Sequence, residues 1–102
     1  MAKGYWIARI DVYDPEAYKA YMAANAAPIK KYKAKFLVRG GKFELKEGFS
    51  RARNVVIEFP SYQDALDCFH CPEYQHALTF RRGAISLGEV IVIEGYDGPQ
   101  PG

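Results

Sequence analysis

The most conspicuous group of reactive side chains is the string Cys68-Phe69-His70-Cys71, with His76 close behind it. Two cysteines at this spacing can form a redox disulfide or supply half of a zinc site. A redox dithiol of the thioredoxin kind, however, belongs at the start of a helix in a different fold. A closed zinc site needs four ligands, which one short helix does not present together. We therefore expect no bound metal, with Cys68 as a small core residue and Cys71 as a helix cap.

A second group consists of charged side chains that fall on one face of the predicted strands: Arg9, Asp11, Arg39, Glu58 and Glu94. Charges that are removed from water must be paired or must bind something. One interpretation is an ion-pair network that fixes the register of a dimer. The other is a polar pocket in which Arg39 or Arg9 holds a carboxylate or enolate through its planar guanidinium while Glu58 acts as a base.

A third candidate site lies between the first predicted helix and the sheet, lined by Trp6, Tyr18, Tyr21 and Asn25. Core packing accounts for the three rings. Asn25 is the exception, because a buried amide needs hydrogen-bond partners. The predicted ligand-binding residues are therefore Arg39, Arg9, Glu58 and Asn25, and no catalytic residue is assigned.

Several familiar chemistries lack their sequence motifs. The chain has no nucleophile elbow, phosphate loop, histidine-rich metal motif or dinucleotide fingerprint, so hydrolase, kinase and nicotinamide enzymes are disfavoured and no cofactor is expected. A net charge of +2 does not indicate a nucleic-acid partner, and the lysines between 30 and 35 are typical of a solvated helix end. No apolar run approaches a membrane span, and two cysteines do not indicate an oxidising compartment, so we expect a cytoplasmic protein.

The hydrophobic pattern predicts the elements that must position these residues. Strands are expected over Tyr5–Tyr13, Lys35–Arg39, Asn54–Phe59 and Glu89–Tyr96, with a short extended piece over Lys42–Lys46. Helices are expected from the Asp14 cap to about Tyr32, with a kink or an early last turn at Pro28, from the Ser61 cap through Phe69, and from Glu73 to about Arg82. This β-α-β-β-α-β order predicts one α+β domain over residues 1–96, with a four-stranded antiparallel sheet, both helical segments on one face and a flexible tail over residues 97–102.

The two faces of the predicted sheet differ in composition. One parity is apolar: Ala8, Ile10, Val12, Phe36, Val38, Val55, Ile57, Phe59, Ile91 and Ile93, which we assign to the helix side. The opposite parity mixes the charges above with apolar residues: Ile7, Leu37, Val56, Val90 and Val92. Contiguous exposed apolar surface usually marks an interface. We therefore predict a homodimer formed through the open sheet face by two-fold symmetry.

Several motifs in fixed order resemble the bacterial domain-of-unknown-function family 1330: Lys3-Gly4-Tyr5-Trp6-Ile7, Asp14-Pro15-Glu16-Ala17-Tyr18, Phe36-Leu37-Val38-Arg39-Gly40-Gly41, Val55-Val56-Ile57-Glu58-Phe59-Pro60-Ser61 and Pro72-Glu73-Tyr74. The resemblance runs from Lys3 to Tyr96. It implies a ferredoxin-like protomer and the face-to-face dimer of the dimeric α/β-barrel superfamily, but it brings no settled activity. Distant relatives include cofactor-free monooxygenases, muconolactone isomerase and stress-responsive barrels. Cys71 departs from the family, which more often has serine there.

The function predicted from these observations is the binding of a small polar or aromatic metabolite, at a sheet-face pocket or a helix–sheet pocket, by a small dimeric α/β-barrel protein. One alternative is a cofactor-independent monooxygenase or isomerase. Another is a non-catalytic structural or stress-related dimer. Fold alone does not decide among them, because one fold hosts many functions.

Overall fold

The computed structural model describes residues 2–102. Its elements are β1 (Gly4–Val12), α1 (Pro15–Ala24), α2 (Ala26–Lys31), β2 (Lys35–Arg39), β3 (Arg53–Phe59), α3 (Tyr62–His70), α4 (Pro72–Leu78) and β4 (Ser86–Glu94). The strands form one sheet in the order β2-β3-β1-β4, and every neighbouring pair is antiparallel. The predicted α+β, ferredoxin-like fold with a four-stranded antiparallel sheet is confirmed.

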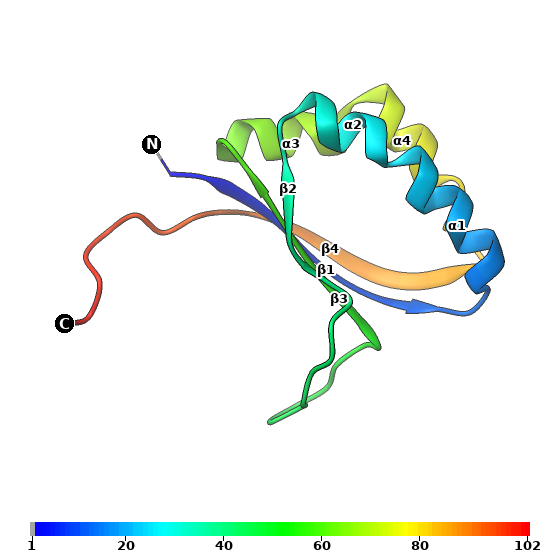
Figure 1. Ribbon diagram of the computed structural model, residues 1–102, viewed down its shortest axis with the longest axis horizontal. Coiled ribbons are helices and arrows are strands. Elements are labelled where there is room, and N and C mark those ends of the chain that lie inside the picture. The colour runs from blue at the N-terminus through cyan, green and yellow to red at the C-terminus, as the bar shows by residue number, and fades with distance from the viewer. Residues whose placement is uncertain (1) are drawn as a thin grey trace.

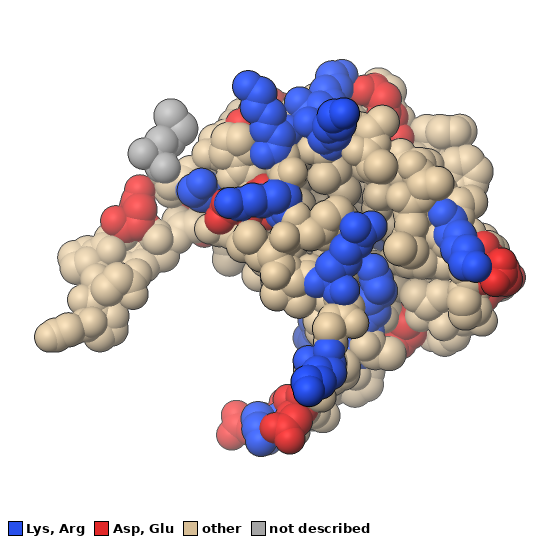
Figure 2. Space-filling model, in the orientation of Figure 1, with Lys and Arg blue, Asp and Glu red and all other residues tan. Residues whose placement is uncertain are grey.

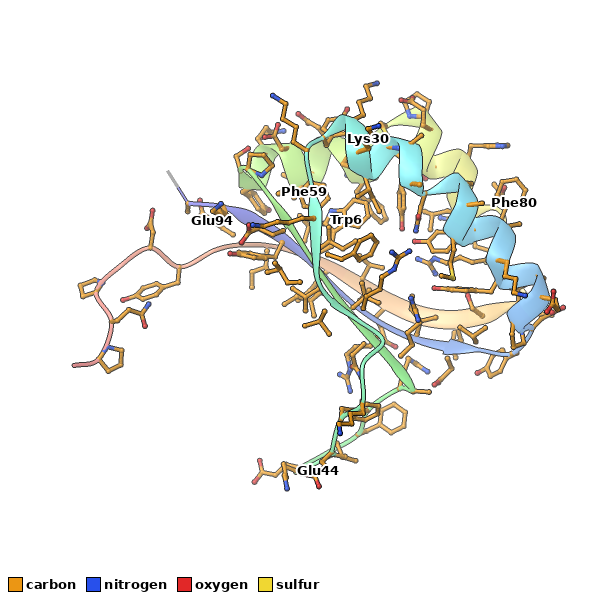
Figure 3. The ribbon with its side chains drawn as sticks, viewed as in Figure 1. Trp6, Lys30, Glu44, Phe59, Phe80 and Glu94 are labelled. Carbon is orange, nitrogen blue, oxygen red and sulfur yellow. The ribbon has the colours of Figure 1, made fainter. Side chains whose placement is uncertain are left out.

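All four helices cover one face of the curved sheet and leave the other face bare (Figure 1). The core fills the space between these two layers, where Figure 3 labels Trp6 and Phe59. Trp6 is 2% exposed and Phe59 is fully buried. The bare face is flanked by the C-terminal tail and by the segment 40–52, which projects from the sheet as a long connection between β2 and β3.

Three helix starts carry side-chain caps that the sequence predicts. Asp14 accepts a hydrogen bond from the Ala17 amide at 3.1 Å, and Ser61 Oγ accepts one from the Asp64 amide at 3.0 Å. Cys71 Sγ accepts one from the Tyr74 amide at 3.4 Å. The prediction that Cys71 is a helix cap is therefore confirmed, as is the placement of Cys68, which is fully buried.

The predicted first helix is two helices, α1 and α2, which meet at Asn25. Pro28 has no amide hydrogen, and its ring clashes with the carbonyl four residues earlier, which belongs to Ala24. The chain therefore ends α1 at Ala24 and begins again, and the break leaves the Asn25 side chain buried at the junction.

Other boundaries differ from the predictions. The last strand begins at Ser86 and ends at Glu94, where Glu89–Tyr96 was expected, because Ser86 pairs with Val12 at the far end of β1. The helix expected to reach Arg82 ends at Leu78 and is followed by turns. The expected strand over Lys42–Lys46 is irregular.

The parity assigned to the last strand is wrong. Ile91 pairs with Ile7 and Ile93 pairs with Tyr5, so both isoleucines lie on the bare face, 51% and 45% exposed. Val90 and Val92 instead pack against the core on the helix side. The sequence gives no way to choose, because Val90, Ile91, Val92 and Ile93 make both parities apolar.

The face assigned to Arg39 is also wrong. Phe36 pairs with Ile57 while Val38 pairs with Val56, so the β2–β3 register shifts at a bulge and Leu37 has no partner. One extra residue exchanges the two faces for everything that follows it. Arg39 is therefore opposite Val55 on the helix side, away from Arg9 and Glu58, and Val38 lies on the bare face, 43% exposed.

Within residues 2–102, none of the helices is long and apolar enough to cross a membrane. The same residues contain no group of three histidine, cysteine or acidic side chains that could hold a metal ion.

Candidate functional site

A cavity lies between the helix side of the sheet and the helices α1 and α4. It is lined by Trp6, Ala8, Ile10, Tyr18, Tyr21, Met22, Asn25, Phe36, Arg39, Arg53, Val55, Ile57, Tyr74 and Val90. The enclosed part measures only about 30 Å³, while the whole depression holds about 410 Å³ of free space, open solvent included. The enclosed part has room for water only, so a larger ligand requires side chains at the mouth of the cavity to move.

Two arginines provide the charge of this cavity. Arg39 ends β2 and its guanidinium stacks on the Phe36 ring, 4.0 Å from the ring centre. Arg53 begins β3 and its guanidinium lies 6.0 Å from the centre of the Tyr18 ring. Arg39 reaches the cavity only because of the bulge in β2. Figure 2 shows basic side chains along β2 and over α2 on the visible face.

Neither arginine has a carboxylate partner. Among the ion pairs of residues 2–102, none includes Arg39 or Arg53, and the cavity lining has no acidic side chain. The Nε atom of Arg53 is buried without a hydrogen-bond partner. A guanidinium withdrawn from water needs an acceptor, and a carboxylate or enolate matches its planar array of donors.

Helices α1 and α4 contribute three tyrosines to the lining of the cavity. The hydroxyl groups of Tyr21 and Tyr74 lie 2.8 Å apart, and the Tyr18 ring centre lies 5.3 Å from that of Tyr21. Burial raises the pKa of Tyr18, and burial together with the neighbouring Tyr21 raises the pKa of Tyr74. Both phenols therefore stay protonated near neutral pH, where they donate hydrogen bonds and do not act as bases.

Asn25 and Trp6 complete the pocket that the sequence predicts. Asn25 is 6% exposed, lines the cavity and makes no side-chain cap to α2. The Trp6 indole nitrogen donates to the Ala65 carbonyl at 2.9 Å, so its ring is held in place and only its face is available. The predicted grouping of Trp6, Tyr18, Tyr21 and Asn25 in one pocket is confirmed, while its use for a ligand remains a prediction.

The bare-face charges are paired with one another or with backbone. Glu58 accepts a hydrogen bond from the Tyr5 hydroxyl at 3.1 Å and lies 3.4 Å from the amines of both Lys3 and Lys35. Burial raises the pKa of Glu58, but Tyr5 and the lysines outweigh it and leave the pKa lowered. Glu58 is therefore ionised and well paired, which makes it a poor base. Arg9, the other predicted ligand-binding residue on this face, donates a hydrogen bond to the Phe49 carbonyl.

A second ion-pair network on this face escaped the sequence reasoning. Arg51 lies 2.8 Å from Asp11 and 2.5 Å from Glu89, and the Ala52 amide donates to Asp11 at 2.9 Å. These contacts tie the entry of β3 to β1 and β4. Glu94, which Figure 3 labels, is exposed and pairs with Gly4, so it shares the parity of Val92, and its predicted place on the bare face is wrong. The five charges predicted to share one face are therefore not a single site.

Arg53 is the other residue that sequence reasoning missed. It precedes Val55 and Ile57 by even steps, so the alternation of β3 places it on the helix side. The sequence contained this signal, because an arginine at the same alternate positions of a strand as buried valine and isoleucine is unusual.

Comparisons with known proteins bear on the fold and the family of this chain. A search of curated protein sequences finds no match. The fold matches the RPA0582 protein of unknown function from Rhodopseudomonas palustris, with a TM-score of 0.73, 17% identity and coverage of 95% of this chain and 85% of that one. It also matches SnoaB, a cofactor-independent oxygenase from Streptomyces nogalater, with a TM-score of 0.62, 17% identity and coverage of 99% and 97%.

These structural matches show the fold alone. The family is shown by the sequence, because residues 3–96 match the model of the domain of unknown function DUF1330. The predicted resemblance is confirmed: this chain belongs to the DUF1330 family.

Proposed function

We propose that this protein binds a small, planar, anionic metabolite in the cavity between the sheet and helices α1 and α4. The observation that carries the proposal is the meeting of Arg39 and Arg53 at an aromatic cavity without any carboxylate partner. An anionic group on the ligand would supply the missing acceptor. The remaining lining suits a flat ring that lies against Trp6, Tyr18 and Phe36.

Entry to this cavity would occur at the edge of the sheet. β2 is a five-residue edge strand, its bulge interrupts the pairing with β3, and Arg39 and Phe36 both belong to it. Edge strands with interrupted pairing open at low free energy relative to central strands. Movement of this strand would enlarge the cavity enough for an aromatic ring.

The test uses Trp6, the single tryptophan of the chain, as a reporter inside the cavity. Its fluorescence should change saturably when benzoate or 4-hydroxybenzoate is added, and much less with benzamide, which lacks the charge. Arg53→Met should weaken binding of the carboxylates roughly tenfold or more, because charge-assisted hydrogen bonds contribute about 1.5–3 kcal/mol.

The matched control is Lys42→Met, which removes a positive charge from the exposed 40–52 segment and should leave the affinity unchanged. Binding that is equal for benzoate and benzamide would contradict an anion site. The absence of any fluorescence response to either carboxylate would favour the structural, non-catalytic alternative.

A second candidate function is a cofactor-independent oxygenase, which the fold match to SnoaB favours. Such chemistry requires a substrate that ionises readily and itself supplies electrons to O2, such as a hydroxyaromatic anion. The lining suits this requirement, because its arginines would stabilise the anion and its tyrosines are not bases. Oxygen uptake that depends on protein, on a hydroxyaromatic substrate and on Arg53 would support it, and uptake unchanged in Arg53→Met would contradict it.

We also propose that the bare sheet face forms a homodimer. Val38, Val56, Ile7 and Ile91 are consecutive partners and form one apolar row across all four strands. Ile7, Val38 and Ile91 are 36%, 43% and 51% exposed in the single chain. A second copy would bury this row by two-fold symmetry, with the paired charges around Glu58 and Arg51 at its borders.

A further inference from the structure

A second hollow, of about 390 Å³, lies where the turn after α4 leads into β4. It is lined by Phe69, Leu78, Arg81, Arg82, Gly83, Ser86, Leu87, Gly88 and Val90. The linings of this hollow and of the cavity described above share only Val90, although Arg81 also reaches Tyr21 of that cavity. Figure 3 labels Phe80, next to Arg81, at this end of the helical layer.

Arg81 is the unusual residue of this hollow. It is 8% exposed, and its guanidinium lies 5.1 Å from the centre of the Tyr21 ring. Among residues 2–102 no carboxylate forms an ion pair with it, and its Nε atom is buried without a hydrogen-bond partner. Arginine is almost never buried without a partner, because its charge loses hydration.

The surrounding tyrosines do not neutralise this charge. Burial lowers the pKa of Arg81, but Tyr21 and Tyr74 outweigh it, so the pKa is raised and the guanidinium stays charged. Burial raises the pKa of Tyr74 in turn, so Tyr74 remains a neutral phenol. The ring of Tyr21 offers a cation–π contact, which stabilises a cation without cancelling it.

Hydrogen bonds fix the backbone of the turn beside the hollow. The Ser86 hydroxyl donates to the Arg81 carbonyl at 2.5 Å, and the Tyr13 and Asp14 amides both donate to the Ile85 carbonyl, which fixes the turn. A Cβ at Gly88 would lie 2.8 Å from the Arg9 carbonyl oxygen, so the close approach of β4 to β1 requires glycine at this position. A side chain there would not fit.

A second positive charge lies beside the first. Arg82 is exposed, lines the hollow and has no ion-pair partner among residues 2–102. The lining contains no acidic residue. Both arginines therefore line an open space of positive potential, and the residues that line it supply no counter-charge.

We propose that this hollow is an anion-binding site in which Arg81 and Arg82 hold an oxyanion group of a small metabolite. The group is a phosphate or a carboxylate, since both present oxygens that match the donors of a guanidinium. Backbone amides of the turn would complete the recognition, because the Ser86 hydroxyl already donates its hydrogen to the Arg81 carbonyl. This site does not depend on the function proposed for the first cavity.

The experiment is an amide NMR titration of the full chain with inorganic phosphate and, separately, with acetate, at constant ionic strength. Saturable shifts are expected at Gly83, Leu87 and Gly88, and the larger response identifies the preferred oxyanion. Arg82→Gln should weaken binding roughly tenfold. Arg81→Lys keeps the positive charge but loses the planar guanidinium with its paired donors, so it should weaken binding as well. Arg82 is exposed, so its replacement should leave the fold intact.

The matched control is Lys30→Gln, which removes an exposed charge from the lysine cluster near the end of α2 and should leave the titration unchanged. Shifts centred on Lys30 and its neighbours, or an affinity that Arg82→Gln does not alter, would overturn the proposal. Arg53→Met separates the two sites, because it should weaken benzoate binding in the first cavity while phosphate or acetate binding at the turn persists.

Discussion

Gly40 lies against Arg53, a residue that lines the cavity: a Cβ built on Gly40 would lie 2.6 Å from Nη1 of Arg53. Gly40 also has a φ of 68°, a left-handed conformation that side chains disfavour. Its amide donates to the Asn54 carbonyl at 2.8 Å, which holds it in this position. The present position of the Arg53 guanidinium therefore requires that residue 40 has no side chain.

Gly40→Ala should displace Arg53 and reduce the affinity for benzoate, and it should lower the free energy of unfolding by about 1 kcal/mol because of the positive φ. Trp6 fluorescence titration and urea denaturation measure the two effects. Gly48→Ala is the matched control, since Gly48 also has a positive φ, 77°, but nothing lies within 4 Å of its Cβ position. It should lose stability and keep its affinity; equal losses of affinity in both variants would refute the role of this contact.

Arg39→Ala should cost less than about 1 kcal/mol of unfolding free energy, because Arg39 has no carboxylate partner and is exposed. Its effect should add to that of Glu58→Leu, since the two residues lie on opposite faces of the sheet and share no contact. Urea denaturation of the two single variants and the double variant checks this. A coupling well above 0.5 kcal/mol would mean that both side chains belong to one network after all.

Acid should destabilise the fold through the paired carboxylates. Hydrogen bonds from the Ala52 amide and Arg51 lower the pKa of Asp11, and Tyr5 and Lys3 lower that of Glu58 despite its burial. Their ordinary values are 3.8 and 4.5, so as the pH falls through this range the unfolded chain binds more protons than the folded one. The stability that these groups add is present above about pH 4.5 and is lost below it.

Thermal denaturation between pH 3 and pH 7 should show this loss, and Asp11→Asn and Glu58→Gln should each reduce the pH dependence. Glu47→Gln is the control, because Glu47 lies in the exposed 40–52 segment and outside the ion pairs of residues 2–102. An unchanged slope in Asp11→Asn would show that other groups dominate the acid response.

Ile91→Lys should disrupt the proposed dimer, because it places a charge in the middle of the apolar row. Burying an unpaired ammonium is costly, so the dissociation constant should rise roughly a hundredfold or more. Analytical ultracentrifugation at micromolar concentration measures it. Ala23→Lys, on the exposed surface of α1, should remain as dimeric as the unaltered chain. A wild-type monomer would rule out this interface.

The overall fold was predictable because local signals agree with one another. The caps at Asp14, Ser61 and Cys71 mark helix starts, and the alternation in β1 and β3 marks strands with one apolar face. The break at Asn25 was only partly predictable, since Pro28 signals a disruption without fixing which residue ends the helix.

The candidate site was less predictable, because it depends on register. The pocket around Trp6 and Asn25 follows from helix and strand spacing alone. The face of Arg39 depends on a bulge that no local propensity announces, and the face of Ile91 depends on pairing with Ile7 across the sheet. Strand pairing is decided by packing across the whole sheet. When both sets of alternate residues in a strand are apolar, the strand sequence alone does not determine which set faces the core.

The bulge at Leu37 affects how relatives of this chain should be aligned. Phe36 and Arg39 share a face although two residues separate them, and one of those two, Leu37, has no partner in β3. A relative with only one residue between the equivalent phenylalanine and arginine would have a regular strand and the same arginine in the same cavity. A single-residue gap at Leu37 is therefore structurally neutral, and an ungapped alignment would mistake such an arginine for a residue of the opposite face.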